Sequence, residues 1–187
     1  SAASDVYKRQ RKDYRKTYDV YKDDTLLNRQ PKKSRKIFVC LDEQRGQYLV
    51  DGLVAMDFPL SSGVKAYPTK TGDYAVISKK EDHTSNLYGK MYDAEGKCIN
   101  YNAESTDPVP EGGRFDGSPM PYWQRLTNAG LGLHVGKVRR HPVSHGCVRL
   151  PRNVAEILYR QTSIGTPVTI RKTPLPVPEA QKVPAVQ

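Results

Sequence analysis

Three histidines and one cysteine gather within fourteen positions of the sequence, in the stretch LGLHVGKVRRHPVSHGCVRLP at residues 131–151. A cysteine thiolate is a strong nucleophile, but a free thiol ionises only near pH ~8.5 and needs a base to take its proton. Histidine can act as that base near neutral pH. A single histidine is usually a surface or packing residue. Three of them around Cys147 instead favour nucleophilic catalysis.

The residues before the cysteine, Ser144-His145-Gly146, are typical of a tight turn that presents a thiol. Consecutive backbone N–H groups in such a turn can bind the oxyanion of a tetrahedral intermediate, and each donor is typically worth ~3 kcal/mol. Gly146 allows the backbone to approach a substrate closely. The turn therefore predicts a thiol and its oxyanion donors in one place.

The base has two candidates. If residues 131–135 form a strand, His134 lies on the face away from the core, over a surface cleared by Gly132 and Gly136. His145 lies closer to the cysteine in sequence and competes for the same role. The residue pattern alone leaves both open.

Zinc binding is the alternative use of this cluster. His141, His145 and Cys147 have suitable ligand chemistry, and His134 could be a fourth ligand. However, Cys147 has no CxxC partner, and the H-x3-H-x-C spacing matches no common structural zinc site. We therefore expect neither a metal nor another cofactor.

The region around the cysteine resembles the L,D-transpeptidase (YkuD-type) family, whose signature is SHGC followed by an apolar residue and Arg, with a histidine upstream. The resemblance covers about residues 37–172. Other matching segments are Ser61-Ser62-Gly63, Thr69-Lys70-Thr71-Gly72-Asp73-Tyr74, Ser85-Asn86-Leu87-Tyr88-Gly89, Met120-Pro121-Tyr122-Trp123 and Gly165-Thr166-Pro167-Val168.

The resemblance implies a role for each catalytic residue. Cys147 would be the nucleophile, and His134 the general base and later the acid. The carbonyl of Val135 would orient His134, and the backbone of His145, Gly146 and Cys147 would form the oxyanion hole. The expected substrate-binding side chains are those of Ser144, Arg149, Tyr88, Tyr122 and Trp123.

The implied reaction is acyl transfer on the stem peptides of peptidoglycan. The thiolate would attack the carbonyl of the third stem residue and release D-Ala, and an amine would take over the thioester in a 3→3 cross-link or in protein anchoring. Alternatives are an L,D-carboxypeptidase or another cysteine hydrolase of the same fold, and a catalytically silent wall-binding module. We expect a monomer in the cell envelope or periplasm, with its export signal removed.

The fold that must position these residues is expected to be mostly β, a sandwich or barrel with one main helix after the cysteine. That helix is predicted at 152–161, where apolar residues recur at i, i+3 and i+4. Strands are predicted at Ile37–Cys40, Gln47–Val50, Val54–Leu60, Tyr74–Ser78, Gly130–Val135 and Pro167–Ile170. The long polar segment 83–121, with a hairpin at 90–100, is expected to be a lid that caps the cleft.

The net charge of +10 first suggests nucleic-acid binding. Residues 1–36, however, hold 12 Lys or Arg and 5 Asp, which is most of the excess. We expect a basic, Tyr-rich arm in which Tyr7, Tyr14, Tyr18 and Tyr21 share one helical face, and which packs on the domain or meets anionic wall polymers or a membrane surface. No nucleic-acid partner is expected.

The chain is divided into a domain and two flanking segments, and two further cysteines lie in the domain. The catalytic domain is assigned to 37–172, and the Pro-rich segment 173–187 is expected to be an extended tail. Cys40 is expected to be buried in a strand, with a disulfide to Cys98 as the alternative. No run approaches the ~18 apolar residues of a membrane-spanning helix.

Overall fold

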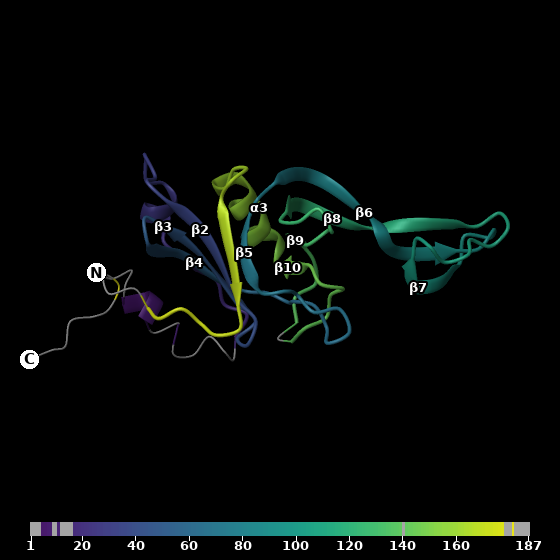
Figure 1. Ribbon diagram of the computed structural model, residues 1–187, viewed down its shortest axis with the longest axis horizontal. Coiled ribbons are helices and arrows are strands. Elements are labelled where there is room, and N and C mark those ends of the chain that lie inside the picture. Colours follow the sequence, from purple (N-terminus) through teal and green to yellow (C-terminus); the bar gives the residue numbers. More distant parts are fainter. Residues whose placement is uncertain (1–4, 9–10, 12–16, 140, 178–180, 182–187) are drawn as a thin grey trace, which may run out of the picture.

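The chain folds into two β-sheets and a helix that packs against both, with one long hairpin projecting from the body (Figure 1). The computed structural model describes residues 5–8, 11, 17–139, 141–177 and 181. Because strands make up most of the secondary structure, the predicted mostly-β class is confirmed. No helix in these described ranges is long and apolar enough to cross a membrane.

The first sheet has six strands in the order β1-β4-β3-β2-β11-β5. All its neighbours are antiparallel except β2 and β11, which run parallel and bring residues 35–40 and 167–171 together. Its strands are β1 (Tyr21–Lys22), β2 (Arg35–Cys40), β3 (Arg45–Val50), β4 (Leu53–Pro59), β5 (Gly72–Ala75) and β11 (Pro167–Arg171).

The second sheet has five strands in the order β10-β9-β8-β6-β7, and it carries the predicted catalytic residues. Here β9 and β10 are parallel, and the other pairs are antiparallel. Its strands are β6 (Ser78–Tyr92), β7 (Cys98–Glu104), β8 (Arg114–Arg125), β9 (Gly132–Val135) and β10 (Val148–Leu150).

The helix α3 (Arg152–Gln161) has the predicted bounds. It buries Val154, Ala155 and Leu158 in a core to which both sheets contribute. Because its apolar residues recur on one face, the helix can pack along its length while Arg160 and Glu156 pair on the exposed side at 2.7 Å. A second, one-turn helix, α2 (Asp24–Leu27), is capped by the Asp23 side chain.

The predicted strand Tyr74–Ser78 is in fact the point at which the chain changes sheets. β5 ends at Ala75 and β6 begins at Ser78. Between them, the Val76 N–H donates to Thr166 in one direction and the Ile77 N–H donates to Arg125 in the second sheet. The alternating pattern continues through the crossover, so it does not reveal the break.

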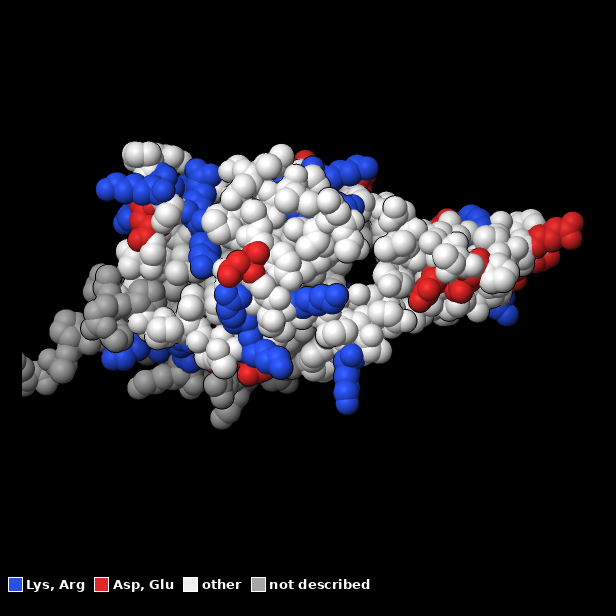
Figure 2. Space-filling view, viewed as in Figure 1, with Lys and Arg blue, Asp and Glu red and all other residues white. Residues whose placement is uncertain are grey.

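Most of the segment 83–121 is strand, with turns at 93–97 and 105–113. β6 and β8 pair from Ser78↔Arg125 out to Tyr92↔Arg114, and β7 joins them as the edge strand. The part nearest the body lies beside the cavity described below, whereas residues 89–117 extend away from it (Figure 1). This outer part holds six acidic and three basic residues, and Figure 2 shows its acidic side chains at the far end.

The basic arm is partly built into the first sheet. Tyr7 and Tyr21 are buried against Val54, with their rings 5.0 Å apart. The expected helical face is wrong in the described part, because Tyr21 lies in β1 and Tyr18 is half exposed. Tyr14 lies outside the described residues. Tyr21 pairs with Asp57 of β4, whereas Tyr18 precedes β1.

The tail was expected to be an extended segment, and its described residues Val177 and Gln181 pack on the first sheet. The side chain of Gln181 accepts from the Val54 N–H at 2.9 Å and donates to the Val54 carbonyl at 3.0 Å. Val177 packs beside Tyr7 and Tyr21. The amide thus supplies partners for a stretch of β4 beyond its short pairing with β1.

The three cysteines are all free thiols, so the alternative Cys40–Cys98 disulfide is wrong. Cys40 is in β2 of the first sheet and Cys98 is in β7 on the projecting hairpin. The predicted burial of Cys40 is correct: its thiol donates to the Lys172 carbonyl at 3.2 Å.

Candidate active site

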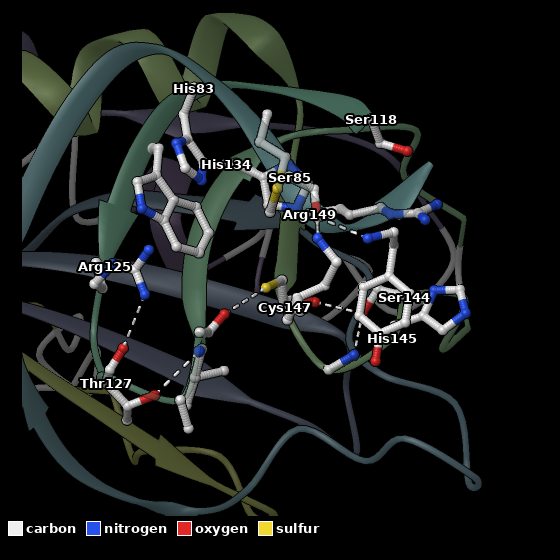
Figure 3. A pocket seen from close by; sticks show the side chains of 18 of the residues that line it. His83, Ser85, Ser118, Arg125, Thr127, His134, Ser144, His145, Cys147 and Arg149 are labelled. Carbon is white, nitrogen blue, oxygen red and sulfur yellow. Dashed lines mark hydrogen bonds between the residues drawn. The ribbon is translucent and has the colours of Figure 1, made fainter. Parts of the chain in front are cut away.

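The parallel pairing of β9 with β10 brings His134 and Cys147 to one place. His134 is opposite Arg149 in the register, and Cys147 immediately precedes β10. Both line a cavity of about 700 Å³ on the second sheet (Figure 3). The twelve residues between them, 135–146, are therefore closed into a loop whose two ends carry the candidate base and the candidate nucleophile.

The His134 ring is buried and anchored by its own backbone neighbour. Its Nδ1 is 2.7 Å from the carbonyl oxygen of Val135. Burial lowers the pKa of His134 to about 4; the Val135 hydrogen bond opposes this shift, and the nearby cations of Arg149 and His83 add to it. The imidazole is therefore neutral at physiological pH.

Cys147 is partly buried in the wall of the cavity. Its Sγ is 3.2 Å from the Gly130 carbonyl, a contact drawn as a dashed line in Figure 3. Burial raises the pKa of Cys147, whereas a backbone hydrogen bond from Gly132 and the charges of Arg125 and Arg149 lower it. The resting group is a thiol that donates to a carbonyl, surrounded by features that favour its anion.

The turn before the thiol is held by Ser144. The Ser144 hydroxyl donates to the Cys147 carbonyl and accepts from the Gly146 N–H at 3.1 Å. Gly146 has φ +119°, a conformation that side-chain-bearing residues rarely adopt. The tight turn predicted from the sequence is thus present, and both roles of the Ser144 hydroxyl are used inside it.

The loop between His134 and Cys147 is tied to the end of β4 through Ser61. The Ser61 hydroxyl donates to the Arg139 carbonyl at 2.7 Å and accepts from the Arg139 N–H at 2.8 Å. Its backbone exchanges two hydrogen bonds with Arg149. Ser61 therefore holds both the loop at Arg139 and strand β10 at Arg149.

The His145 ring is held between two tyrosines. It stacks on Tyr88 with ring centroids 4.3 Å apart, and the centroid of Tyr67 lies 4.9 Å from it on a tilted plane. Burial lowers the pKa of His145. This ring forms part of the cavity wall together with the predicted residue Tyr88.

Trp123 forms the wall on the side of His134. Its ring centroid lies 6.1 Å from that of His134 and stacks on His83 at 4.9 Å. A Cβ on Gly132 would lie 2.4 Å from the indole, so only glycine leaves room for it there. The guanidinium of Arg125 lies over the same indole, 5.4 Å from its centroid.

Eight of the ten residues expected at the site from the sequence line the cavity. Cys147, His134, His145, Gly146, Ser144, Arg149, Tyr88 and Trp123 line it, and Val135 contacts His134 from outside. Tyr122 does not line it: its ring packs on Tyr159 of α3 at 5.5 Å. Adjacent strand residues face opposite sides, so Trp123 and Tyr122 cannot both reach the cavity.

The sequence reasoning missed three residues of the site: His83, Arg125 and Tyr67. His83 and Arg125 line the cavity, and Tyr67 supports His145. Arg125 lies two residues after Trp123, so strand alternation would have placed it on the same face. His83 and Tyr67 depend on non-local pairing and had no comparable local signal.

The alternative zinc site is not supported, because in the described ranges no three His, Cys, Asp or Glu side chains come together to hold a metal ion. His141 is exposed, and its Nδ1 is 3.1 Å from the Pro142 carbonyl. It does not line the cavity that contains His145 and Cys147.

Comparison with known proteins agrees with this fold. Residues 34–170 match the YkuD family model, described as the L,D-transpeptidase catalytic domain. The chain is 31% identical over 121 residues to "Probable L,D-transpeptidase 3" of Mycobacterium tuberculosis, a match that covers 61% of this chain and 38% of the relative.

Solved structures share the fold. An L,D-transpeptidase from Mycobacterium smegmatis has a TM-score of 0.56 at 22% identity, covering 74% of this chain and 58% of that one. An L,D-transpeptidase in complex with imipenem has a TM-score of 0.57 at 20% identity, covering 74% and 59%. The chain thus spans well under two thirds of the length of each of these relatives. Because the family model extends over most of its sequence, the chain belongs to the L,D-transpeptidase catalytic domain family.

Proposed function

We propose that this protein is a peptidoglycan L,D-transpeptidase in which Cys147 is the nucleophile and His134 is the base. The observation that carries the proposal is the pairing of β9 with β10, which places both side chains on one cavity. The thiolate attacks the carbonyl of the third stem residue and expels D-Ala. The resulting thioester passes to an amine acceptor.

The proton can be followed through the reaction. The Val135 carbonyl can only accept a hydrogen bond, so Nδ1 of His134 carries the ring proton and Nε2 carries the lone pair. Nε2 takes the proton from Cys147 as sulfur attacks, and gives it to the nitrogen of D-Ala as that amide bond breaks. The acceptor amine then loses a proton to Nε2 as it attacks the thioester, and the thiol is regenerated with that proton.

The oxyanion would be stabilised by the turn at His145, Gly146 and Cys147. Because the Gly146 N–H already donates to Ser144, the neighbouring N–H groups must supply much of this stabilisation. Ser144 accordingly acts by holding the turn rather than by contacting substrate. Each well-placed donor is worth ~3 kcal/mol of transition-state stabilisation.

The cavity walls fit a peptide that carries carboxylates. Arg125 and Arg149 supply two cations near the thiol, and both act on the ionisation of Cys147. Tyr88 and Trp123 supply flat apolar surface on the two sides of the cavity. We propose that the stem peptide lies between them, with its carboxylates toward the arginines. Tyr122 has no part in this contact.

Exposure to a carbapenem tests the nucleophile. The intact mass of the protein should increase by one carbapenem, located on Cys147 by peptide mapping, and the Cys147→Ala variant should show no increase. Cys40 is buried and serves as an internal control, because its pKa is raised by burial to about 11. An unchanged mass of correctly folded protein would exclude the proposed nucleophile.

The base is tested by comparing two histidine variants with the same reagent. His134→Ala should abolish acylation while the fold is kept, and His145→Ala should lower the rate less, because its ring acts as cavity wall. If His145→Ala alone abolished acylation, the two roles would be reversed.

The acceptor is tested with tetrapeptide-containing muropeptides analysed by mass spectrometry. Cross-linked dimers with loss of D-Ala are the result expected for a transpeptidase. Tripeptides without dimers would instead identify an L,D-carboxypeptidase, in which water takes the acyl group. Unchanged muropeptides together with a carbapenem-reactive cysteine would contradict the proposed substrate.

We also propose that the protein acts in the cell envelope, where its substrate is. The Lys and Arg side chains spread over the body in Figure 2 would favour anionic wall polymers or a membrane surface as non-specific partners. Binding of the folded chain to anionic vesicles or wall polymer that is lost as salt is raised would support this partner.

A further inference from the structure

The side chain of Thr69 connects two backbone segments behind the active site. Its Oγ1 accepts from the Gly63 N–H at 2.8 Å and donates to the Gly146 carbonyl at 2.6 Å. A hydroxyl has one hydrogen to donate, and this one is used on Gly146. Thr69 is buried at 5% exposure, so it is a component of the structure rather than a group offered to substrate.

The bond to the Gly146 carbonyl also fixes the next amide. The Gly146 carbonyl and the Cys147 N–H belong to one planar peptide unit, in which they point in opposite directions. Holding the carbonyl toward Thr69 therefore turns the Cys147 N–H away from Thr69. Gly146 and Cys147 both line the cavity, whereas Thr69 lies behind its wall.

The peptide unit between Gly146 and Cys147 needs a hydrogen bond that fixes its orientation. Gly146 has φ +119° and no side chain, so its flanking peptides are free to rotate unless something fixes them. The preceding amide is fixed by Ser144, which accepts the Gly146 N–H. Thr69 fixes the following peptide unit in the same way, by donating to the Gly146 carbonyl.

The contact is also close on the side of Gly63. A Cβ on Gly63 would lie 2.8 Å from the Gly146 Cα and 2.0 Å from the Tyr67 carbonyl. The Ser-Ser-Gly segment and the nucleophile turn thus lie backbone to backbone, and the Thr69 hydroxyl bridges them. Backbone hydrogen bonds also join the two segments, from the Ser144 N–H to the Ser62 carbonyl and from the Val64 N–H to the Ser144 carbonyl, both at 3.0 Å. The Thr69 hydroxyl adds the contact that reaches the Gly146 carbonyl.

We propose that Thr69 is a positioning residue that directs the Cys147 N–H at the oxyanion formed during acylation. The inference rests on the proposed acyl-transfer function, which it deepens. It predicts a defect that is specific to reactions passing through an oxyanion. Reactions that need only the thiolate should be affected little.

Two reagents separate these requirements. Imipenem acylates through a tetrahedral oxyanion, whereas iodoacetamide alkylates a thiolate at a saturated carbon and forms no oxyanion. In the full chain, Thr69→Val should lower the rate constant of imipenem acylation about 10²-fold, the effect of one lost oxyanion donor. Iodoacetamide alkylation of Cys147 should change by less than about threefold, because the thiol environment stays intact.

One control variant keeps the hydroxyl at position 69, and the other makes the same substitution at a buried threonine elsewhere. Thr69→Ser retains both hydrogen bonds and should acylate at nearly the wild-type rate. Thr169→Val removes a buried threonine hydroxyl that donates to Asp73 at 2.9 Å in the first sheet, and should leave both rates unchanged. If Thr69→Val does not fold by circular dichroism, Thr69→Ala gives the same comparison with a smaller side chain.

The outcomes distinguish this inference from the function beneath it. Equal losses in acylation and alkylation, or no loss of acylation in folded Thr69→Val, would overturn the role of Thr69. Failure of the wild-type chain itself to react with imipenem while iodoacetamide still modifies Cys147 would instead overturn the proposed acyl transfer.

Discussion

The Nδ1 atom of His134 lies 2.7 Å from the carbonyl oxygen of Val135, the next residue in the chain. The carbonyl selects one tautomer, which leaves the lone pair on Nε2. Since burial holds the pKa of His134 near 4 and raises that of Cys147, the resting site contains a neutral imidazole and a neutral thiol. In the proposed reaction we therefore expect proton transfer to accompany attack on the substrate rather than to precede it.

The pH dependence of acylation follows from that neutral pair. His134 can accept a proton only when it is unprotonated, so the rate should fall on the acid side with a midpoint near pH 4, well below the usual histidine value. Stopped-flow measurement of carbapenem acylation gives this profile, and NMR titration of the imidazole gives the pKa independently. A midpoint near pH ~6.5 by both methods would show that His134 is not buried as a neutral base.

Arg125 should tune the nucleophile. Its guanidinium lowers the pKa of Cys147, so Arg125→Gln should raise that pKa and shift the iodoacetamide alkylation curve to higher pH. Arg114→Gln is a matched control, because Arg114 is exposed on the hairpin and pairs with Asp116 at 3.1 Å. A shift of the same size in both variants would mean that Arg125 acts only through net charge.

The residues that local pattern could identify are those whose roles depend on short stretches of chain. The helix at 152–161 was predictable because its apolar residues recur on one face, and Cys147 because its turn sequence is contiguous. His134 required one further step, the alternation of a strand. In each case the relevant geometry is fixed within about ten residues.

The residues that could not be predicted depend on pairings between distant segments. His83 reaches Trp123 only through the pairing of β6 with β8, whose register shifts between Thr84 and Gly89. The strands of 83–121 also lack the apolar alternation that marks a half-buried sheet, because their outer part is exposed on both faces. Nothing local separates such strands from a polar loop.

Gly132 should be intolerant of a side chain. A Cβ would lie 2.4 Å from the Trp123 ring and 2.6 Å from the Gln124 carbonyl, so Gly132→Ala should lower the free energy of unfolding by about 1–3 kcal/mol and slow acylation. Urea denaturation measures the first effect and carbapenem kinetics the second. Trp123→Phe removes the clashing part of the ring, so Gly132→Ala should cost less in that background. An equal cost in both backgrounds would show that the clash is with the backbone alone.

The arm before residue 37 should contribute to the stability of the fold, and two of its tyrosines allow a matched test. Tyr7 has no exposed surface, and its hydroxyl accepts from Gln47 Nε2 at 2.6 Å, whereas Tyr18 is 51% exposed. Tyr7→Ala removes a buried ring and leaves Gln47 without that partner, so it should lower the free energy of unfolding by about 3–5 kcal/mol. Tyr18→Ala should change it by less than about 0.5 kcal/mol. Small and equal changes in urea denaturation would mean that the arm does not pack on β3 and β4 in solution, and that its basic charge alone accounts for its role.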